Sequence, residues 1–481
     1  MTDEKVPKSN TKQLKEQTGA SKRLKTSAAD STTDKVAKKT NYKYDPSYKF
    51  IEPKIEKCEE ALTFNPVYFL RTHSKNNDPA DVQTQIWQCS FEPDPQEPSK
   101  HTDIVATCGG TSVCFICVKT GEVILKYNRN TKGATSENLY ALVWSSLPLD
   151  EMGMKRMNIL AAAGGKSTVI LIHPEAGCCY QMFRTVSNKA NMVVCSLLFH
   201  PMKASWLFCG HNDGHIQLWD VGVPSLPSYD VTPVHLIKIP PVGGDVYNLA
   251  FSQTNDVLIA GCEQGLYFWK VDIEKVEKNH KLDYTEVHLN VSIPKDSGTV
   301  VDSICLIRDN ILALKCALHG FIYLFNISKH LDDATYNPDS GRGVLELVSD
   351  DILHLQWSGT DNFYMNMGAD RKTCTLVCGD DKGTLWVYDV ASYINGEIES
   401  PLYGNTSLPP IKPDTKLDWP ELDDAEVEKA RKLRLDTYDI VVDKCTVSEG
   451  GKYIVAVTNN NMVCIWKRGP EEENGNEEPK S

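Results

Sequence analysis

Three ring-bearing side chains stand where apolar, β-like runs begin, and they are the residues best suited to binding: Trp87, Tyr140 and His354. If these runs are equivalent inner strands of a repeated fold, their first residues converge at one mouth of a central channel. Aromatic faces gathered there attract a quaternary ammonium, such as that of a methylated lysine, by about 0.5–2 kcal/mol for each well-placed face. The alternative is that the rings pack between repeats as ordinary aromatic contacts.

A glycine-rich run, Gly164-Gly165-Lys166-Ser167, has the ending of a phosphate-binding loop but not its surroundings. The motif needs a glycine five positions before its second glycine, and that position holds Leu160. A β-like run follows at residues 168–172, where the phosphate site needs the N-terminus of a helix. We therefore expect no nucleotide to bind here.

The cysteines and histidines show no spacing that predicts a metal site or a nucleophile. Cys114 and Cys117 have the CxxC separation, but no second CxxC or HxxxH pair follows them. In an alternating strand their thiols would also face opposite sides. The twelve histidines are scattered, and no GxSxG motif occurs. We expect no metal, no cofactor, no small-molecule substrate and no enzymatic activity.

The elements that would position the three rings are β-strands that recur along the chain. The clearest example is residues 209–220, where a turn rich in Gly and Asn joins two strands. Seven third strands are recognised by the residues at which they end: Ile116, Ile172, Trp219, Trp269, Phe325, Tyr388 and Trp466. Apolar first strands precede them at 87–91, 142–144, 196–201, 247–251, 303–306, 354–357 and 444–447. The ends lie 47 to 78 residues apart, which exceeds the roughly 40–45 residues of a minimal four-stranded unit and predicts loop insertions.

This pattern predicts an all-β fold, a seven-bladed β-propeller. The ends at Trp219-Asp220 and Tyr388-Asp389 make its units resemble WD40 repeats. The ring must close, and the last unit has only three clear strands. We therefore expect the strand at residues 64–74 to supply the outer strand of the last blade, which removes two sheet edges.

Three further segments accompany the propeller, which is expected at residues 64–468. Residues 1–49 are poor in large apolar side chains, so a disordered basic tail is expected. Two basic clusters in it look like a bipartite nuclear import signal, with a solubilising tail as the alternative: Lys22, Arg23, Lys35, Lys38 and Lys39. Residues 391–437 are expected to form an insertion between blades six and seven, with a helix at 420–434. Residues 469–481 are expected to be a disordered acidic tail.

Charge and hydropathy narrow the function further. The net charge is −13, of which residues 1–49 contribute +6 from twelve Lys/Arg and six Asp/Glu, so the rest of the chain carries −19. A body this acidic disfavours wrapping nucleic acid and leaves the tail as the nucleic-acid or receptor contact. No apolar run approaches the roughly 18 residues of a membrane span, and no secretory signal is visible. Free thiols in a reducing compartment and no membrane contact are expected.

Several stretches together resemble the WD domain of the leucine-rich-repeat and WD-repeat proteins associated with the origin recognition complex. They are residues 72–79 (THSKNNDP), 84–93 (TQIWQCSFEP), 218–224 (LWDVGVP), 258–263 (LIAGCE) and 377–380 (VCGD). The resemblance covers about residues 64–468. It does not extend to a leucine-rich repeat, because residues 1–60 contain only the leucines Leu14 and Leu24.

The resemblance implies a non-catalytic nuclear scaffold, associated with chromosomes, that supports replication initiation and heterochromatin organisation. Its implied partners are origin recognition complex subunits and methylated histone tails on nucleosomes, here the repressive methyl-lysine marks. The basic tail implies an import receptor. A ubiquitin-ligase substrate receptor is a third possibility, but such propellers usually carry Arg two residues after Trp-Asp, and Trp219-Asp220 is followed by Val-Gly.

The propeller is also similar to the embryonic-ectoderm-development subunit of Polycomb methyltransferase complexes. That family reads trimethyl-lysine with an aromatic cage at the channel mouth, so a Polycomb-type reader subunit is the alternative function. By this resemblance Trp87 and Tyr140 fall on cage positions. The sixth-blade position, which has two adjacent aromatics in that family, is expected at Leu353-His354, so the cage is expected to be incomplete.

Overall fold

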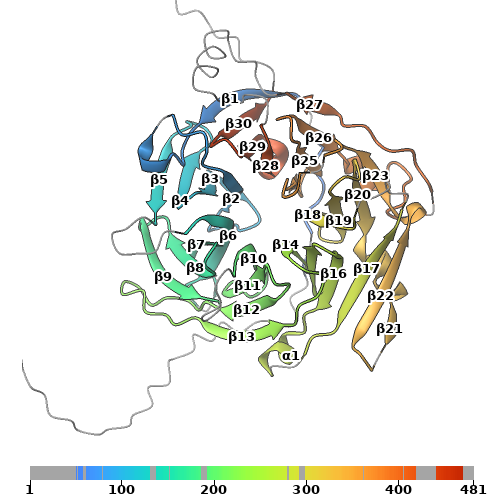
Figure 1. The fold of residues 1–481 in the computed structure, drawn as a ribbon, viewed down its shortest axis with the longest axis horizontal. Coiled ribbons are helices and arrows are strands. Elements are labelled where there is room, and N and C mark those ends of the chain that lie inside the picture. The colour runs from blue at the N-terminus through green and yellow to red at the C-terminus, as the bar shows by residue number, and fades with distance from the viewer. Residues whose placement is uncertain are drawn as a thin grey trace, which may run out of the picture. The chain divides into compact units, whose positions relative to one another are not determined.

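The structure of the protein is a computed structural model. It describes residues 50, 52–57, 61–78, 80–129, 137–150, 152–185, 192–278, 281–291, 298–337, 339–360, 362–404, 406–418 and 440–469. The described residues form seven sheets around a common axis, which confirms the predicted seven-bladed β-propeller (Figure 1). The basic tail with its predicted import residues, the predicted helix at 420–434 and the tail from residue 470 lie outside the described residues.

Each blade runs from an inner strand beside the axis to an outer strand at the rim. Blade 1 contains β2 (Ile86–Pro93), β3 (His101–Gly109), β4 (Ser112–Cys117) and β5 (Val123–Asn128). Blade 2 contains β6 (Leu139–Pro148), β7 (Arg156–Gly164), β8 (Thr168–His173) and β9 (Cys178–Arg184). Blade 3 contains β10 (Val194–Phe199), β11 (Trp206–His211), β12 (Ile216–Asp220) and β13 (Val234–Ile239).

The remaining blades follow the same order around the ring. Blade 4 contains β14 (Val246–Ser252), β15 (Val257–Cys262), β16 (Gly265–Lys270) and β17 (Tyr284–Asn290). Blade 5 contains β18 (Val301–Arg308), β19 (Ile311–Cys316), β20 (Phe321–Asn326) and β23 (Leu353–Gln356). Blade 6 contains β24 (Gly368–Asp370), β25 (Thr375–Gly379), β26 (Leu385–Asp389) and β27 (Thr415–Leu417). Blade 7 contains β28 (Val442–Val447), β29 (Tyr453–Thr458), β30 (Val463–Arg468) and β1 (Phe64–Leu70).

The core of the described propeller is divided among the interfaces between blades. Seven hydrophobic clusters occur, one for each pair of neighbouring blades. A middle strand such as β8 is therefore covered on both faces, and all six of its residues are buried. This explains why the middle strands read as near-continuous apolar runs, whereas a strand with one solvated face alternates.

The first strand of the propeller closes the ring. β1 pairs antiparallel with β30, from Phe64 opposite Arg468 to Leu70 opposite Val463. The predicted pairing of the two ends is therefore confirmed, although the strand ends at Leu70 rather than residue 74. The pairing hides the edge of blade 7, which would otherwise expose a row of unpaired backbone groups.

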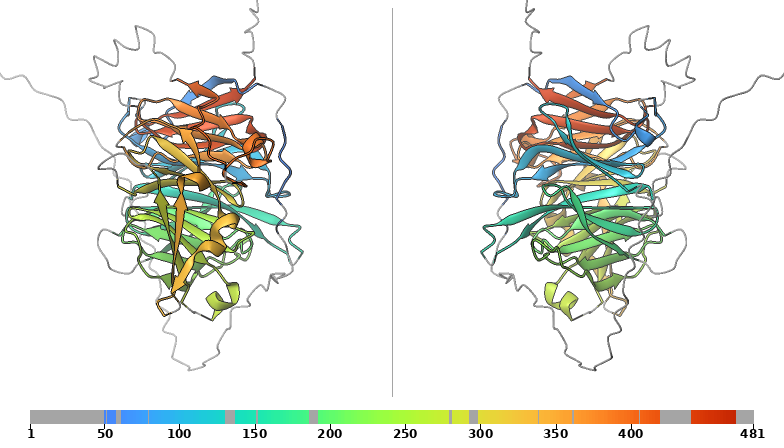
Figure 2. Two further views of the ribbon diagram at one scale, coloured as in Figure 1. Left: turned by 90° about the vertical axis from the view of Figure 1, so that its right-hand side faces the viewer. Right: turned by 90° about the vertical axis from the view of Figure 1, so that its left-hand side faces the viewer.

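The outer strand of blade 5 follows in the chain only after two strands that belong to blade 4, and this overturns one prediction. After β20 the chain forms α2 (Ile327–His330), η2 (Leu331–Asp333), β21 (Thr335–Asn337) and β22 (Arg342–Val348). β22 pairs in parallel with β17 and so extends blade 4 to six strands. The added strands β21 and β22 face the viewer in the left view of Figure 2. The chain then passes η3 (Ser349–Asp351) and returns as β23, the outer strand of blade 5. The residues predicted to begin the inner strand of blade 6 thus belong to the rim of blade 5.

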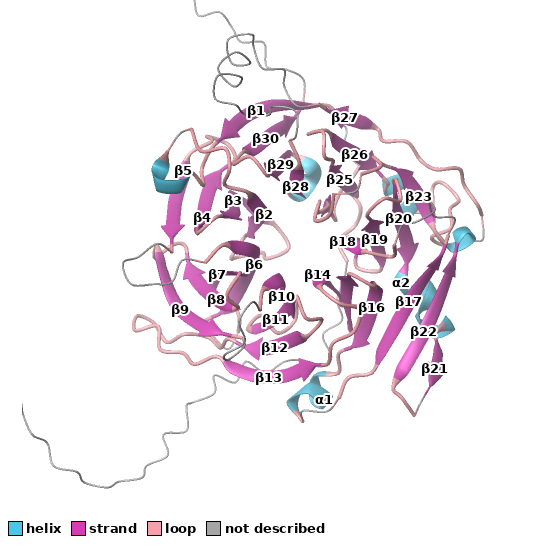
Figure 3. Cartoon of the chain, in the orientation of Figure 1, coloured by secondary structure: helices cyan, strands magenta, loops and turns pink. Residues whose placement is uncertain are grey.

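Strands make up the ring, with short helices between some of them (Figure 3). The other helical segments are η1 (Lys75–Asn77), α1 (Ile273–Glu277), α3 (Ala391–Ile394) and η4 (Glu449–Gly451). Within the range predicted as an insertion, 391–437, α3 is followed by β27, which pairs with β26 as the outer strand of blade 6. Among the described residues, no helix has the length and apolar character needed to cross a membrane.

Candidate functional site

Six inner strands of the described propeller share a local irregularity at their second residue. Each starts with a buried aliphatic residue, and the register then shifts across the residue that follows. A bulge of this kind changes the direction in which a side chain points. Because the strands are equivalent, the six bulged residues surround the same end of the axis: Trp87, Tyr140, Cys195, Tyr247, Asp302 and Asp443.

Aromatic rings from four parts of the chain meet at this end of the axis. The ring centroids of Trp87 and Tyr140 are 5.3 Å apart, with an interplanar angle of 82°. Trp87 also meets Tyr364 edge to face at 6.2 Å, and Tyr364 meets Tyr247 at 4.9 Å. We call Trp87, Tyr140, Tyr247 and Tyr364 the aromatic cluster. Because Trp87 belongs to blade 1 and Tyr247 to blade 4, Tyr364 links two inner strands that are not neighbours.

The cluster is not sealed from solvent. Tyr364 is 38% exposed, and the adjacent Phe363 is 43% exposed. Trp87, Tyr140 and Tyr247 are partly buried. These faces are therefore accessible to a small cation, which a wholly buried packing cluster would exclude.

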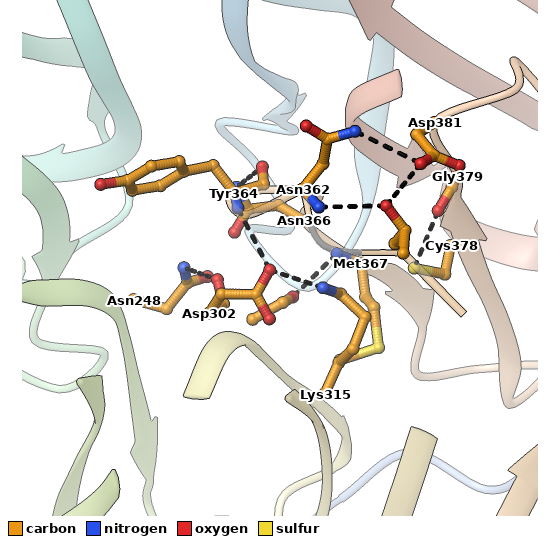
Figure 4. A network of polar contacts seen from close by, with 12 residues as sticks. Asn248, Asp302, Lys315, Asn362, Tyr364, Asn366, Met367, Cys378, Gly379 and Asp381 are labelled. Carbon is orange, nitrogen blue, oxygen red and sulfur yellow. Dashed lines mark hydrogen bonds and ion pairs between the residues drawn. The ribbon is translucent and has the colours of Figure 1, made fainter. Parts of the chain in front are cut away.

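Tyr364 adopts an uncommon backbone conformation. It lies on the connection between β23 and β24, with a φ of 69°, in the left-handed region that a bulky residue rarely occupies. Such a conformation costs on the order of 1–3 kcal/mol and persists only where the surroundings impose it. The Tyr364 backbone N–H donates to Asp302 Oδ2 at 3.1 Å, and its carbonyl accepts from Asn366 Nδ2 at 2.8 Å. Figure 4 shows this network.

The Asp302 carboxylate, which accepts from the Tyr364 backbone N–H, belongs to a buried ion pair. Lys315 Nζ lies 2.6 Å from Asp302 Oδ2, and both side chains are fully buried. The ammonium also lies 4.7 Å from the centroid of the Trp357 ring. The second carboxylate oxygen, Asp302 Oδ1, meets no hydrogen-bond donor among the described residues.

The electrostatic surroundings of the cluster are negative. Burial raises the pKa of Asp245, and the carboxylates of Glu263 and Asp213 add to the effect. Burial also raises the pKa of the Tyr364 phenol, and Asp245 and Glu263 contribute in the same direction. Burial likewise raises the pKa of the Tyr247 phenol, and the neighbouring Tyr364, Asp245 and Glu263 contribute in the same direction. Neutral phenols beside several carboxylates form a site that favours a cation over an anion.

A second buried carboxyl lies at the equivalent position of blade 7. Asp443 is 2% exposed, and Gln85 Nε2 donates to its Oδ1 at 2.8 Å. Its Oδ2 has no hydrogen-bond partner within the described part of the chain. Burial raises the pKa of Asp443 to about 8.

The structure brings together two of the three predicted site residues. Trp87 and Tyr140 are in contact, as expected from their places on β2 and β6. His354 is not near them by topology, since it lies on the outer strand β23 opposite Tyr323. Its ring packs against Tyr323 at 5.3 Å, and its Nδ1 is 3.1 Å from the Ile352 carbonyl. The placement of His354 at the channel mouth was therefore wrong.

The prediction missed Tyr247 and Tyr364. Tyr247 had a sequence signal, because Val246-Tyr247 repeats the aliphatic-then-ring pattern of Ile86-Trp87. Tyr364 had none, because it lies on a connection and reaches the cluster through backbone contacts. Together with Phe363 it supplies two adjacent aromatics on the connection that leads to blade 6, ten residues after His354.

Among the described residues, no group of three or more His, Cys, Asp or Glu is arranged to hold a metal ion. Cys114 of the CxxC pair is buried and donates to the Thr72 carbonyl. Burial raises the pKa of Cys114 to about 11. A thiol held protonated in this way is a weak metal ligand.

Residues 56–469 match the family described as leucine-rich repeat and WD repeat-containing protein 1, WD domain. The chain belongs to this family. The Xenopus tropicalis member is 32% identical over 457 residues, covering 92% of this chain and 60% of that protein. The mouse member is 32% identical over 416 residues, and the human member is 31% identical over 414 residues. Each of these two matches covers 85% of this chain and 59% of the relative. The chain thus spans about three fifths of the length of these relatives.

Solved structures with a similar fold belong to Polycomb repressive complex 2 of Chaetomium thermophilum. A chain of the complex solved with H3K27me3 superposes with a TM-score of 0.59 at 13% identity, covering 84% of this chain and 98% of that one. A chain of the apo, autoinhibited complex gives a TM-score of 0.58 at 12% identity, with the same coverage. At this level of identity the likeness establishes the propeller fold alone.

Proposed function

We propose that the chain is a non-catalytic chromatin-binding scaffold whose propeller takes up a methylated lysine of a histone tail at the aromatic cluster. The observation that carries the proposal is the convergence of Trp87, Tyr140, Tyr247 and Tyr364 at one end of the axis. Several ring faces around one point attract a quaternary ammonium, whose charge cannot be matched by a hydrogen bond.

Two features favour a binding site over simple packing. Packing between blades needs buried rings, whereas Tyr364 is 38% exposed. Packing also gives no reason for a strained tyrosine, and Tyr364 has a φ of 69°. The nearby carboxylates of Asp245 and Glu263 add attraction for the basic residues that surround a histone lysine.

The ring faces predict the effect of removing each one. Replacing Trp87 or Tyr364 with alanine is expected to weaken binding of trimethyl-lysine peptides by roughly 2- to 30-fold. A histone-peptide array, followed by titration of the full chain, measures this effect. The control is Tyr336→Ala, which removes a 49% exposed tyrosine from β21, away from the inner strands. If both cluster variants bind as the unaltered chain does, the rings serve packing and the proposed site is wrong.

The proposal extends to a nuclear, chromosome-associated role with the origin recognition complex. Its support is membership of the family and the paired basic clusters at Lys22-Arg23 and Lys35–Lys39, which suit an import receptor. Polycomb repressive complex 2 supplies the alternative, a reader subunit of a histone methyltransferase, which the shared fold favours. Purification of the chain from nuclei distinguishes them. If origin recognition subunits co-purify with the chain, the first role is supported. If methyltransferase subunits co-purify, the second role is supported. If neither set of subunits co-purifies, both roles are contradicted.

A further inference from the structure

We propose that the buried Asp302–Lys315 ion pair is the positioning device of the aromatic cluster: it holds the Tyr364 backbone so that the Tyr364 ring meets Trp87 and Tyr247. The inference assigns a role to two residues that touch no ligand. It depends on the proposed function only where ligand binding is measured, because the placement of Tyr364 can be followed without any ligand.

A single oxygen atom joins the ion pair to the loop. Asp302 Oδ2 accepts from Lys315 Nζ at 2.6 Å and from the Tyr364 backbone N–H at 3.1 Å. Lys315 projects from the middle strand β19, so its ammonium fixes the carboxylate from inside the blade. The carboxylate in turn holds Tyr364, which lies two residues before the bridge of this connection to blade 7, at Asn366 opposite Lys444. A hydrogen bond to an ionised acceptor is roughly twice as strong as a neutral one.

The carbonyl side of Tyr364 is held as well. Asn366 Nδ2 donates to the Tyr364 carbonyl at 2.8 Å, while the Asn366 backbone N–H donates to the Asp443 carbonyl at 2.8 Å. One residue further along, the Met367 N–H donates to Ser303 Oγ at 3.0 Å. Residues 364–367 are therefore tied to the inner strands of blades 5 and 7. Figure 4 shows the contact of Tyr364 with Asp302 of blade 5.

Stability alone gives no reason for a charged pair at this place. Apolar residues of similar volume often replace a buried ion pair with no loss of stability. An apolar pair here would, however, leave the Tyr364 N–H without an acceptor. Position 302 is also the bulged position that presents Trp87, Tyr140 and Tyr247 on other blades. In blade 5 this position holds Asp302, whose carboxylate binds the backbone of Tyr364, and the Tyr364 ring then joins the aromatic cluster from the loop.

Two double variants separate positioning from packing. Asp302→Leu with Lys315→Met removes both charges and the acceptor, while keeping the side-chain volumes similar. Asp302→Asn with Lys315→Met removes the same charges but retains an oxygen that can accept from Tyr364. Hydrogen exchange of the peptide that contains Tyr364, measured by mass spectrometry on the full chain, reports on the contact directly.

The leucine variant is expected to exchange the Tyr364 amide about tenfold faster than the asparagine variant, even though the unpaired N–H donors of the buried asparagine make that variant the less stable of the two. Trimethyl-lysine peptide binding is expected to fall roughly 2- to 30-fold in the leucine variant and to be retained in the asparagine variant. Equal amide exchange in the two variants would overturn the positioning role, whatever the binding result. If exchange differs but the unaltered chain binds no methylated peptide, the positioning role stands and the proposed function fails.

Discussion

Replacing Lys315 with methionine is expected to lower the free energy of unfolding by about 3–5 kcal/mol, the range found when one partner of a buried ion pair is removed. The substitution leaves the Asp302 carboxylate fully buried, with Oδ1 already lacking a donor among the described residues. The remaining partner of Oδ2 is then the Tyr364 N–H. Urea unfolding of the full chain at neutral pH measures the loss.

The matched control for this effect is Lys416→Met. Lys416 also stacks on a tryptophan, with its Nζ 3.6 Å from the Trp386 ring centroid, but it is exposed. Removing a solvated cation–π contact is expected to cost about 1 kcal/mol or less. Adding Asp302→Leu to Lys315→Met is expected to restore most of the lost stability, since no unpaired charge is left. A loss below about 1 kcal/mol in the Lys315 variant alone would show that the pair is not ionised.

Asparagine at position 443 is expected to make the stability of the protein less dependent on pH. The folded state raises the pKa of Asp443 from 3.8 to about 8, so the folded state retains a proton that the unfolded chain has released. Its contribution to stability is therefore complete below about pH 4 and is lost as the pH rises towards 8. Between pH 5 and pH 8 this amounts to on the order of 4 kcal/mol for a fully buried carboxyl.

The asparagine variant stays neutral at every pH and can still accept from Gln85. The expected result is that Asp443→Asn gains stability over the unaltered chain as the pH rises from 5 to 8, measured by urea unfolding at each pH. Asp339→Asn, at an exposed position on the β21–β22 turn, controls for the change in net charge. A stability difference that is constant over this range would contradict the raised pKa of Asp443.

The fold was largely predictable because the propeller repeats its signal. Each predicted unit has an apolar first strand and a third strand with a bulky end. Because this pattern occurs seven times, it predicts the fold even though each single unit matches it imperfectly. The error arose where the repeat is interrupted. Residues 327–352 add β21 and β22 to blade 4, so the outer strand of blade 5 appears late and resembles the next inner strand. The inner strand of blade 6 has only three residues, Gly368–Asp370, and gave little signal of its own.

The candidate site was predictable in so far as it depends on strand register. Trp87 and Tyr140 were found because inner strands present equivalent residues at one end of the axis, and the bulges strengthen that rule. Tyr364 depends instead on a tertiary contact with Asp302 on β18, together with a local contact with Asn366 two residues further on. The contact with Asp302 joins distant parts of the sequence, so no local periodicity could have indicated the position of Tyr364.

The central claim is that the aromatic cluster binds a cation. The most direct measurement is a titration of the full chain with three forms of the histone peptide that binds best on the array. These forms carry trimethyl-lysine, its neutral carbon isostere with a tert-butyl group, and unmodified lysine. Cation–π attraction from several rings predicts that trimethyl-lysine binds about tenfold or more tightly than the isostere of the same shape. Equal affinities for the charged and neutral forms would contradict the account.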